Sequence, residues 1–330
     1  MKPLFDDVLL FCPEVPTGGP EAMHQLSHAI NSMGGRAHMV YYDGPSRVEI
    51  NGNVIRNVNA QSPMPAHFAH YQPKPLQEMA LTERVLAIYP EPAIDVALQP
   101  AANRRAIWWL SVDNAVGKFR QLADAEQRRR LFLNSDILHF CQSDYARQFL
   151  GDCVKQAQML SDYTDPALVV QSASTQPIVQ RPKRLCFFPT KGAALAKRFL
   201  TEHPLPEGIE VTAIHGMSKA QVRETLLHAQ IYIDFGNQPG KDRVPREAAV
   251  AGAVILLHAT GAAKHPLDHP LAPQYLFTAD DIGSGKLHQL VADIFANPAI
   301  HAAAQAKYRK NILGEQPRFN EEVRAVFFTD

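Results

Sequence analysis

The 330-residue sequence lacks the features that would place it in several large classes of protein. Its four cysteines lie far apart and form no Cys-x-x-Cys pair, so neither a zinc cage nor a disulfide framework is indicated. No apolar run approaches the ~20 residues that a membrane span requires. The acidic pair Asp6-Asp7 also breaks any signal-peptide pattern. We therefore expect a cytoplasmic location, with peripheral contact at a membrane left open.

Net charge and several familiar catalytic motifs are also absent. The 33 Lys and Arg residues balance 33 Asp and Glu residues, so no global field attracts nucleic acid and any anion must bind locally. Without Gly-x-Gly-x-x-Gly, a P-loop lysine or Gly-x-Ser-x-Gly, the sequence gives little support to dinucleotide redox chemistry, ATP hydrolysis or serine hydrolysis. His24 and His28 are four residues apart, but no Glu completes a zincin motif, and we expect no metal.

What the sequence does contain is a long alternation of apolar runs with helical patterns. In the first half, strands are predicted at 8–12, 37–42, 84–89, 106–110 and 137–141, with a hairpin at 47–58 and a basic helix at 122–133. In the second half, strands are predicted at 184–188, 209–214, 231–234 and after Gly252. This alternation predicts an α/β protein with mostly parallel, doubly wound sheets.

The length of the chain suits two domains of about 150 residues each. A polar stretch with two prolines separates the two series of strands and reads as a linker. We expect an N-terminal domain over 1–170, a linker over 171–184, a C-terminal domain over 185–310 and a tail over 311–330 that packs back on the first domain. Both domains are expected to be Rossmann-like and to face each other across a cleft.

The most informative segment follows the strand that ends at Asp234. Its charged residues lie at a strand's carboxyl end and lead into a helix that we expect Glu247 to open. Amides and guanidinium groups there can point at one anion, typically a phosphate. Glu247 suits a sugar instead, because a carboxylate accepts hydrogen bonds from two vicinal ribose hydroxyls. The alternative is a solvated, charged connection. The expected ligand-binding residues of this loop, besides Glu247, are Gly240, Lys241, Asp242, Arg243 and Arg246.

Other strand ends carry further candidate site residues. Gly18 and Gly19 precede a helix and would let a ligand approach the backbone, or they form a simple turn. Lys191 and Gly192 follow the first strand of the second half, where Lys191 could share a diphosphate with Arg243. Carboxylates suited to acid–base work or to an acceptor hydroxyl also follow strands, although each is as readily a loop cap. These carboxylates are Glu14, Glu91 and Asp113.

Several of these motifs resemble nucleotide-sugar glycosyltransferases of the GT-B fold, of the group-1 type. The group-1 pattern is carried by Phe235-Gly236, Glu247-Ala248-Ala249 and Gly252-Ala253-Val254-Ile255. A closer resemblance is to glycosyltransferases of bacterial surface-polysaccharide (capsule and O-antigen) clusters. It is carried by residues 18–21, 108–114, 142–146, 160–163, 232–236, 239–243 and 245–249.

The resemblance implies transfer of a sugar from a nucleotide-diphosphate donor to a glycan or lipid-linked acceptor. It places Glu247 on the donor ribose and Lys191 with Arg243 on the diphosphate. Asp113 and Glu91 are the expected catalytic carboxylates because of their positions at strand ends, and the resemblance does not assign them. Because that fold class usually needs no divalent metal, the two cations would stabilise the leaving group, and no cofactor is expected. The chain departs from the group-1 pattern at 237–240, where the upstream glutamate is missing and Asp242 is the candidate substitute.

Two other functions fit the same residues. One is a non-catalytic nucleotide- or phosphate-binding module of a polysaccharide-assembly complex. The other is a sugar-nucleotide epimerase of the same two-domain architecture. Transfer to an acceptor separates the glycosyltransferase from both.

Overall fold

The computed structural model describes residues 1–43, 48–51, 53–57, 62–99, 101–115, 136–151, 154 and 157–329. The chain divides into two compact units, one of Met1–Asp162 with Pro317–Asp330 and one of Tyr163–Gln316. The predicted basic helix at 122–133 lies outside the described residues.

The first unit is built on a parallel sheet in the order β10-β9-β8-β7-β2-β3. Its strands are β2 (Asp7–Pro13), β3 (Ala37–Tyr42), β7 (Val85–Pro90), β8 (Arg104–Trp109), β9 (Ile137–Cys141) and β10 (Ala157–Met159). The main helices are α1 (Gly18–Ser32), α3 (Ile94–Ala97), α6 (Asp144–Leu150) and α15 (Glu315–Phe327), with a short α2 (Met64–His67). Alternate residues of each strand face opposite sides, so both faces of the sheet must be covered.

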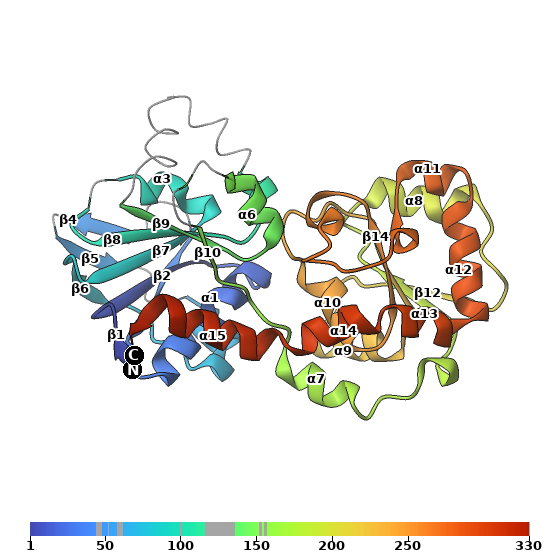
Figure 1. The fold of residues 1–330 in the computed structure, drawn as a ribbon, viewed down its shortest axis with the longest axis horizontal. Helices are drawn as coiled ribbons and strands as arrows, with labels where there is room; N and C mark the ends of the chain where they lie inside the picture. Colours follow the sequence, from blue (N-terminus) through green and yellow to red (C-terminus); the bar gives the residue numbers. More distant parts are fainter. Residues whose placement is uncertain are drawn as a thin grey trace. The chain divides into compact units, whose positions relative to one another are not determined.

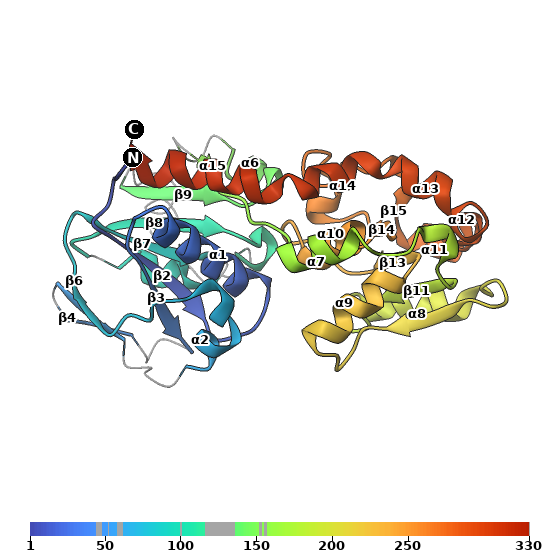
Figure 2. The ribbon, with the colours of Figure 1, turned by 90° about the horizontal axis from the view of Figure 1, so that it is seen from below.

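Helices cover both faces of this first sheet (Figures 1 and 2). On one face Leu9 and Trp109 pack in a core with Ile94 of α3 and Leu150 of α6. On the other face α1 lies along β2 and β3, and the rings of Phe140 in β9 and Phe327 in α15 are 5.9 Å apart. The predicted hairpin is present as β4 (Val48–Asn51) and β5 (Val54–Asn57), and β6 (Glu78–Ala80) pairs with β5.

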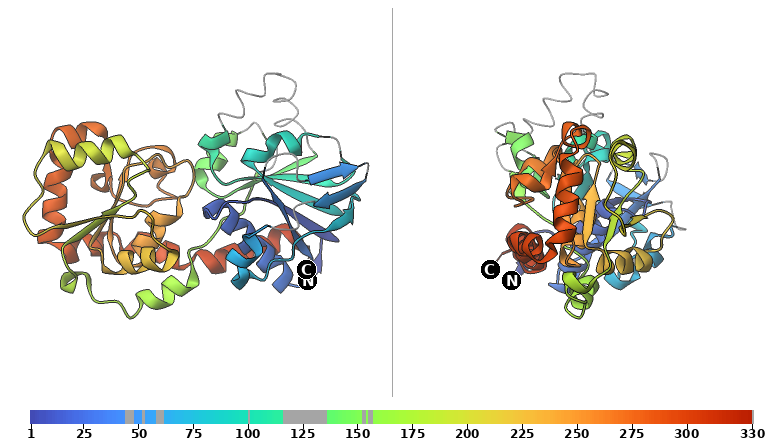
Figure 3. Two further views of the ribbon diagram at one scale, coloured as in Figure 1. Left: turned by 180° about the vertical axis from the view of Figure 1, so that it is seen from behind. Right: turned by 90° about the vertical axis from the view of Figure 1, so that its right-hand side faces the viewer.

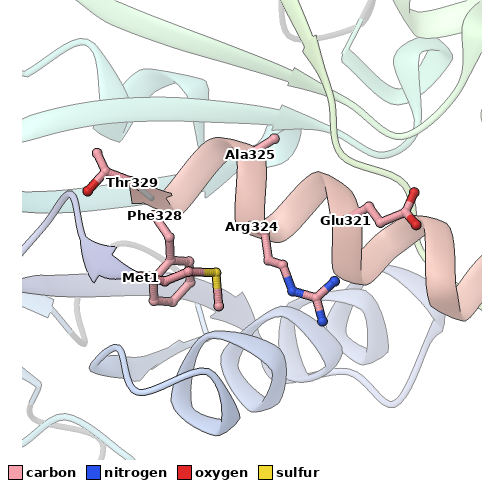
Figure 4. A pocket seen from close by; sticks show the side chains of 6 residues that line it. All are labelled: Met1, Glu321, Arg324, Ala325, Phe328 and Thr329. Carbon is pink, nitrogen blue, oxygen red and sulfur yellow. The ribbon is translucent and has the colours of Figure 1, made fainter.

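The ends of the chain meet in the first unit. Strand β1 (Lys2–Pro3) pairs antiparallel with β16 (Phe328–Thr329), directly after α15. Beside this pair is an open hollow of about 560 Å³. Figure 4 shows the Met1 side chain against the Phe328 ring, with Arg324 and Glu321 along the outside of α15. The hollow offers one cation and one carboxylate and no grouped acid–base residues.

The second unit has a five-stranded parallel sheet in the order β12-β11-β13-β14-β15 (Figures 1 and 3). Its strands are β11 (Arg184–Phe187), β12 (Glu210–Ala213), β13 (Ile231–Asp234), β14 (Val254–His258) and β15 (Leu276–Phe277). Its main helices are α7 (Pro166–Ser172), α8 (Ala193–Glu202), α9 (Lys219–His228), α10 (Arg243–Val250), α11 (Ala279–Gly283), α12 (Lys286–Ala296), α13 (Pro298–Ala304) and α14 (Ala306–Leu313).

Two cores enclose this second sheet. Tyr232 and Ile255 point to a core that Ala248 of α10 and Tyr308 of α14 complete. The alternate residues Ile231 and Ile233 point the other way, to a core with helices α8, α11 and α12. The predicted α/β class with two Rossmann-like domains is therefore confirmed. Among the described helices, none is long and apolar enough to cross a membrane.

The division between the units lies before the expected linker at 171–184. That stretch belongs to the second unit, because it contains the end of α7 and the 3-10 helix η5 (Ile178–Gln180). Leu168 of α7 is buried in one core of the second unit, and Ile178 packs against the other. The polar composition that suggested a linker hides these apolar anchors. Residues 317–330 of the tail group with the first unit.

Three helix boundaries differ from the prediction. Helix α1 begins at Gly18, before Pro20, and α10 begins at Arg243, so that Glu247 is an interior residue and does not open the helix. Pro245 is the third residue of α10, where its missing N–H would have no helical partner in any case. The sequence predicts one helix over 298–310, opened by Pro298, but the structure has α13 and α14 there, separated at Gln305. The side-chain amide of Gln305 forms two hydrogen bonds with the backbone of Ile255.

Candidate functional site

The candidate site is the carboxyl edge of the second sheet. There the turn after β11, the loop after β13 and the loop after β14 make backbone contact, and glycines allow it. Gly192 has φ +73°, and a Cβ there would overlap the carbonyl oxygen of Phe235. Gly261 has φ +50°, and a Cβ there would overlap the carbonyl oxygen of Gln238. Since only glycine accepts both the positive φ and the close approach, the sequence fixes this contact between loops.

Lys191 is held between two carboxylates at this edge. Its Nζ lies 3.1 Å from Oδ2 of Asp234, and it also donates a short hydrogen bond to Asp242. Asp234 is buried, and its other oxygen accepts a hydrogen bond from the backbone N–H of Gly236 at 2.9 Å. Tyr232 donates its hydroxyl to Asp234 at 3.2 Å. Lys191 is therefore at the predicted place, but it carries two counter-ions that the sequence analysis did not assign.

The ionisation of this group follows from burial and pairing. Burial by itself would lower the pKa of Lys191, but Asp242 and Asp234 raise it above its ordinary value. Burial raises the pKa of Asp242, while Lys191 opposes that shift. The ammonium group thus stays charged, and an incoming anion must compete with Asp242 for it.

Two of the expected anion-binding cations are directed inward. The Arg246 side chain has no exposed surface, and its Nη1 donates to Glu315 at 2.8 Å. Arg246 also donates to the backbone carbonyls of Asp242 and Lys241. The Nζ of Lys241 forms an ion pair with Glu315 at 2.8 Å and is 10% exposed. Burial of Arg246 does not fit the expected contact with a donor phosphate, because the guanidinium has no path to a ligand in this arrangement.

Three other predicted residues, Arg243, Glu247 and Gly240, lie in the loop before α10 or in its first turns. Arg243 is the first residue of α10 and donates a hydrogen bond from Nη2 to the carbonyl of Tyr163 at 2.9 Å. Glu247 is half-buried one turn further along the same helix, and Gly240 is buried in the loop before it. The loop also encloses Gln238, whose two side-chain amide atoms have no hydrogen-bond partner among the described residues. A buried amide of this kind calls for a water or ligand partner.

The candidate residues of the first unit also follow strands. Glu91 follows β7, is 3% exposed and accepts a hydrogen bond from the N–H of Leu110 at 3.1 Å. Burial raises the pKa of Glu91 to about 7. Asp113 lies in the helical turn after β8, is half-buried and accepts a hydrogen bond from the Tyr145 hydroxyl at 2.6 Å. Of the two, Asp113 is the more accessible to a substrate.

Gly18 and Gly19 form the first turn of α1 instead of a loop before it. Neither has a positive φ, and a Cβ at Gly19 would meet only Leu110 Cδ1, at an ordinary 3.6 Å. The backbone itself therefore does not require glycine at these positions.

The structure brings together residues that the sequence analysis did not single out. Asp234, Glu315 and Tyr163 partner the predicted cations, although two of them are far from the loop in sequence. Only Asp234 gave a signal, as an acid that ends a buried strand. Within the described residues, no three His, Cys, Asp or Glu side chains are grouped so that they could hold a metal ion.

Comparisons with known proteins find similarity in structure alone. No protein-family model and no curated protein sequence matches the chain. Anabaena HepE in complex with UDP superposes with a TM-score of 0.61 at 10% identity, covering 97% of this chain and 98% of that one. Sucrose-phosphate synthase from Thermosynechococcus elongatus gives 0.56 at 13% identity, covering 98% and 95%. WaaG, a glycosyltransferase involved in lipopolysaccharide biosynthesis, gives 0.55 at 11% identity, covering 96% and 99%. The chain thus has the GT-B fold over nearly its whole length.

Proposed function

We propose that this protein is a glycosyltransferase that moves a sugar from a nucleotide-diphosphate donor to a hydroxyl of a glycan or lipid-linked acceptor in the synthesis of a surface polysaccharide. The observation that carries the proposal is the packing of the Lys191 turn against the loop that leads into α10, at the carboxyl edge of a parallel sheet. Ligands of open α/β sheets bind at this edge. UDP or a UDP-sugar is bound in several solved structures of the same fold.

The second unit is the proposed donor unit. Lys191 and Arg243 bind the diphosphate, with Lys191 exchanging Asp242 for a phosphate oxygen, and Glu247 accepts the ribose hydroxyls. Gly192, Gly240 and the N–H groups at the start of α10 let the phosphates approach the backbone. Lys241 and Arg246 do not contact the ligand in this proposal; they hold the loop in place through Glu315.

Gln238 lies in the stretch 237–240, where the group-1 glutamate is missing, and is the proposed contact of the donor sugar there. Its unsatisfied amide is suited to hydroxyls of the donor sugar, because it offers both a donor and an acceptor. The side chain is enclosed, so the loop must open for this contact to form. An opening loop would also free Asp242 from Lys191.

The first unit is the proposed acceptor unit. The acceptor oxygen forms a bond to the anomeric carbon while the bond from that carbon to the diphosphate oxygen breaks. The acceptor proton passes to a carboxylate, for which Asp113 is the accessible candidate, while Glu91 positions the end of β8 through Leu110. Gly18 and Gly19 give the start of α1 room beside a ligand. The developing charge on the leaving diphosphate is stabilised by fixed cations and helix N–H groups, so no proton donor or metal is required there.

A binding titration of the purified protein with UDP, GDP, CMP and TDP tests the donor site first. Glu247→Ala should raise the Kd of the preferred nucleotide at least about ten-fold, the range expected when a charged hydrogen-bonding group is lost. The matched control is Glu224→Ala on α9, an exposed glutamate outside the site. Equal nucleotide affinity in wild type and Glu247→Ala would remove Glu247 from the site.

A transfer assay with glycan and lipid-linked acceptors separates the candidate functions. Release of the nucleotide together with a new glycosidic bond supports the glycosyltransferase. Nucleotide binding without transfer or hydrolysis would favour a binding module, and interconversion of one nucleotide sugar without an acceptor would favour an epimerase.

A further inference from the structure

The chain passes between the two units twice, after Asp162 and after Gln316. We call residues 160–164 and the first turn of α15 the crossing segments. Two glutamates of α15 anchor them, and each glutamate contacts a residue of its own unit. Glu322 accepts hydrogen bonds from the N–H and the hydroxyl of Ser161 at 2.6 and 2.7 Å. Glu315 accepts the same two kinds of hydrogen bond from Thr164, at 3.2 and 3.1 Å.

This repeated pattern follows from helix geometry. Glu315 and Glu322 are seven residues apart, which is two helical turns, so both carboxylates lie on one face of α15. Ser161 and Thr164 are both buried, and each satisfies its backbone N–H and its hydroxyl on a carboxylate. Glu315 is 1% exposed, and a carboxylate so deeply buried is stable only when it is paired.

The partners of Glu315 connect the crossing segments to the candidate site. Its carboxylate also pairs with Arg246 and with Lys241, each at 2.8 Å. Arg243 reaches the first crossing segment directly, through the carbonyl of Tyr163 at 2.9 Å. The three basic side chains of the segment 241–246, at the start of α10, thus end on residues of, or bonded to, the crossing segments. The same three cations were expected from the sequence to bind an anion.

We propose that Glu315 couples occupancy of the loop between β13 and α10 to the order of the two crossing segments. A diphosphate bound at this loop fixes Arg243 and the N-terminus of α10, and the fixed cations hold Glu315 and Thr164 in turn. Because the coupling is reciprocal, loosening the crossing segments at Glu315 weakens the binding of the anion. Glu315 is a positioning residue, because its buried carboxylate touches no ligand. The identity of the anion rests on the proposed function, whereas the contacts that transmit the coupling do not.

Glu315→Gln and Glu322→Gln make a matched pair for the test. Both remove one carboxylate charge that binds a hydroxyl and an N–H, but only Glu315 contacts the loop cations. In the full-length protein, hydrogen exchange of Glu315→Gln should rise both at 160–165 and at 236–246. In Glu322→Gln it should rise at 160–162 alone. UDP should bind Glu315→Gln about ten-fold more weakly than wild type, with Glu322→Gln within about two-fold of wild type.

Thr164→Val covers the case in which Glu315→Gln does not fold, since it keeps the pairs of Glu315 with Arg246 and Lys241. In wild type, UDP should slow exchange at both 160–165 and 236–246. In Thr164→Val, UDP should still slow exchange at 236–246 and should slow it much less at 160–165. UDP that binds wild type without protecting 160–165, or that protects 160–165 equally in Thr164→Val, would overturn the coupling. If UDP does not bind wild type but GDP, CMP or TDP does, that nucleotide replaces UDP in these measurements. If none of the four binds, the proposed function fails, and the exchange pattern of the ligand-free variants still decides the linkage.

Discussion

At the scale of single residues, the cations at the carboxyl edge of the second sheet do not act alone. Lys191 faces Asp234 and Asp242, and Arg246 faces Glu315, so each cation is fixed by an acid that burial forces to be paired. Fixed charges cost no reorganisation when a transition state forms, which is the usual requirement for electrostatic catalysis. The same pairing makes Asp242 an internal competitor for any phosphate that binds Lys191.

Asp242→Asn should therefore tighten the binding of UDP. Asparagine keeps the size of the side chain and removes the competing charge, while Asp234 still orients Lys191. The expected gain is about three- to ten-fold in Kd, in keeping with the ~1 kcal/mol of a partly exposed ion pair. Calorimetric titration at constant ionic strength measures it. Asp281→Asn, at the start of α11, is the control and should leave the Kd unchanged. Weaker UDP binding by Asp242→Asn would instead show that Asp242 supports the ligand.

At the scale of elements, the site depends on the contact between the turn after β11 and the loop after β13. Neighbouring parallel strands bring their carboxyl ends together, but the loops can touch only where a side chain is absent. Gly192 and Gly236 meet this condition on the two sides of the contact, since a Cβ at Gly236 would overlap the Lys191 side chain. By letting the two loops approach, the glycines thus position Lys191.

Gly192→Ala should lower the free energy of unfolding by about 3 kcal/mol or more. The substitution adds an overlap with the Phe235 carbonyl to the strain of a positive φ. Gly208→Ala is the control, because Gly208 has φ +77° and no heavy atom within 4 Å of a Cβ. It should lose only the ~1–2 kcal/mol of backbone strain. Urea denaturation of both variants measures the difference, and equal losses would contradict the loop contact.

At the scale of the whole molecule, buried titratable groups make stability depend on pH in opposite directions. Burial raises the pKa of Glu91 from 4.5 to about 7, so between these values the native state holds a proton that the unfolded state has released. Its contribution is therefore lost as the pH rises through that window. Burial lowers the pKa of His24 from 6.5 to about 4, and its contribution is lost as the pH falls through that window.

Glu91→Gln should flatten the loss of stability toward neutral pH. Glutamine keeps an acceptor for the N–H of Leu110 but does not ionise. Relative to wild type, the variant should gain up to ~3 kcal/mol of unfolding free energy between about pH 5 and 8. Urea denaturation of the first unit's transition at several pH values tests this. An unchanged pH slope would place the ionisation of Glu91 outside that range.

Much of the fold could be predicted because it depends on local pattern. The strands that end at Cys141, Phe187 and Asp234 are short apolar runs bounded by turn residues, and the structure has them within one or two residues of the predicted bounds. The start of α10 could not be predicted in this way. Glu247 was expected to open this helix, yet Pro245 lies in its first turn, where proline is tolerated, so composition alone does not fix the boundary.

The candidate site was only partly predictable from the sequence. Lys191, Gly192 and Arg243 could be proposed as site residues because strand ends in a parallel sheet share one edge. Their partners could not be predicted, because Glu315 and Tyr163 are far from the loop in sequence. Nothing in the local sequence distinguishes Glu315 from other charged residues, and Tyr163 takes part through its backbone carbonyl. The inward direction of Arg246 was equally hidden, since burial depends on what packs above a helix.

Local sequence patterns were enough to predict the α/β class, the two series of parallel strands and the loop at which an anion is expected to bind. Periodicity and turn residues act over a few positions, so one sequence is enough to read them. Packing across the fold sets which charges of the segment 241–247 are internal and which remain near the surface, and this could be read from the tertiary structure alone. The physical reason is that a buried cation must find a carboxylate wherever the fold brings one. Here the fold brings Asp234 from the preceding strand and Glu315 from the last helix.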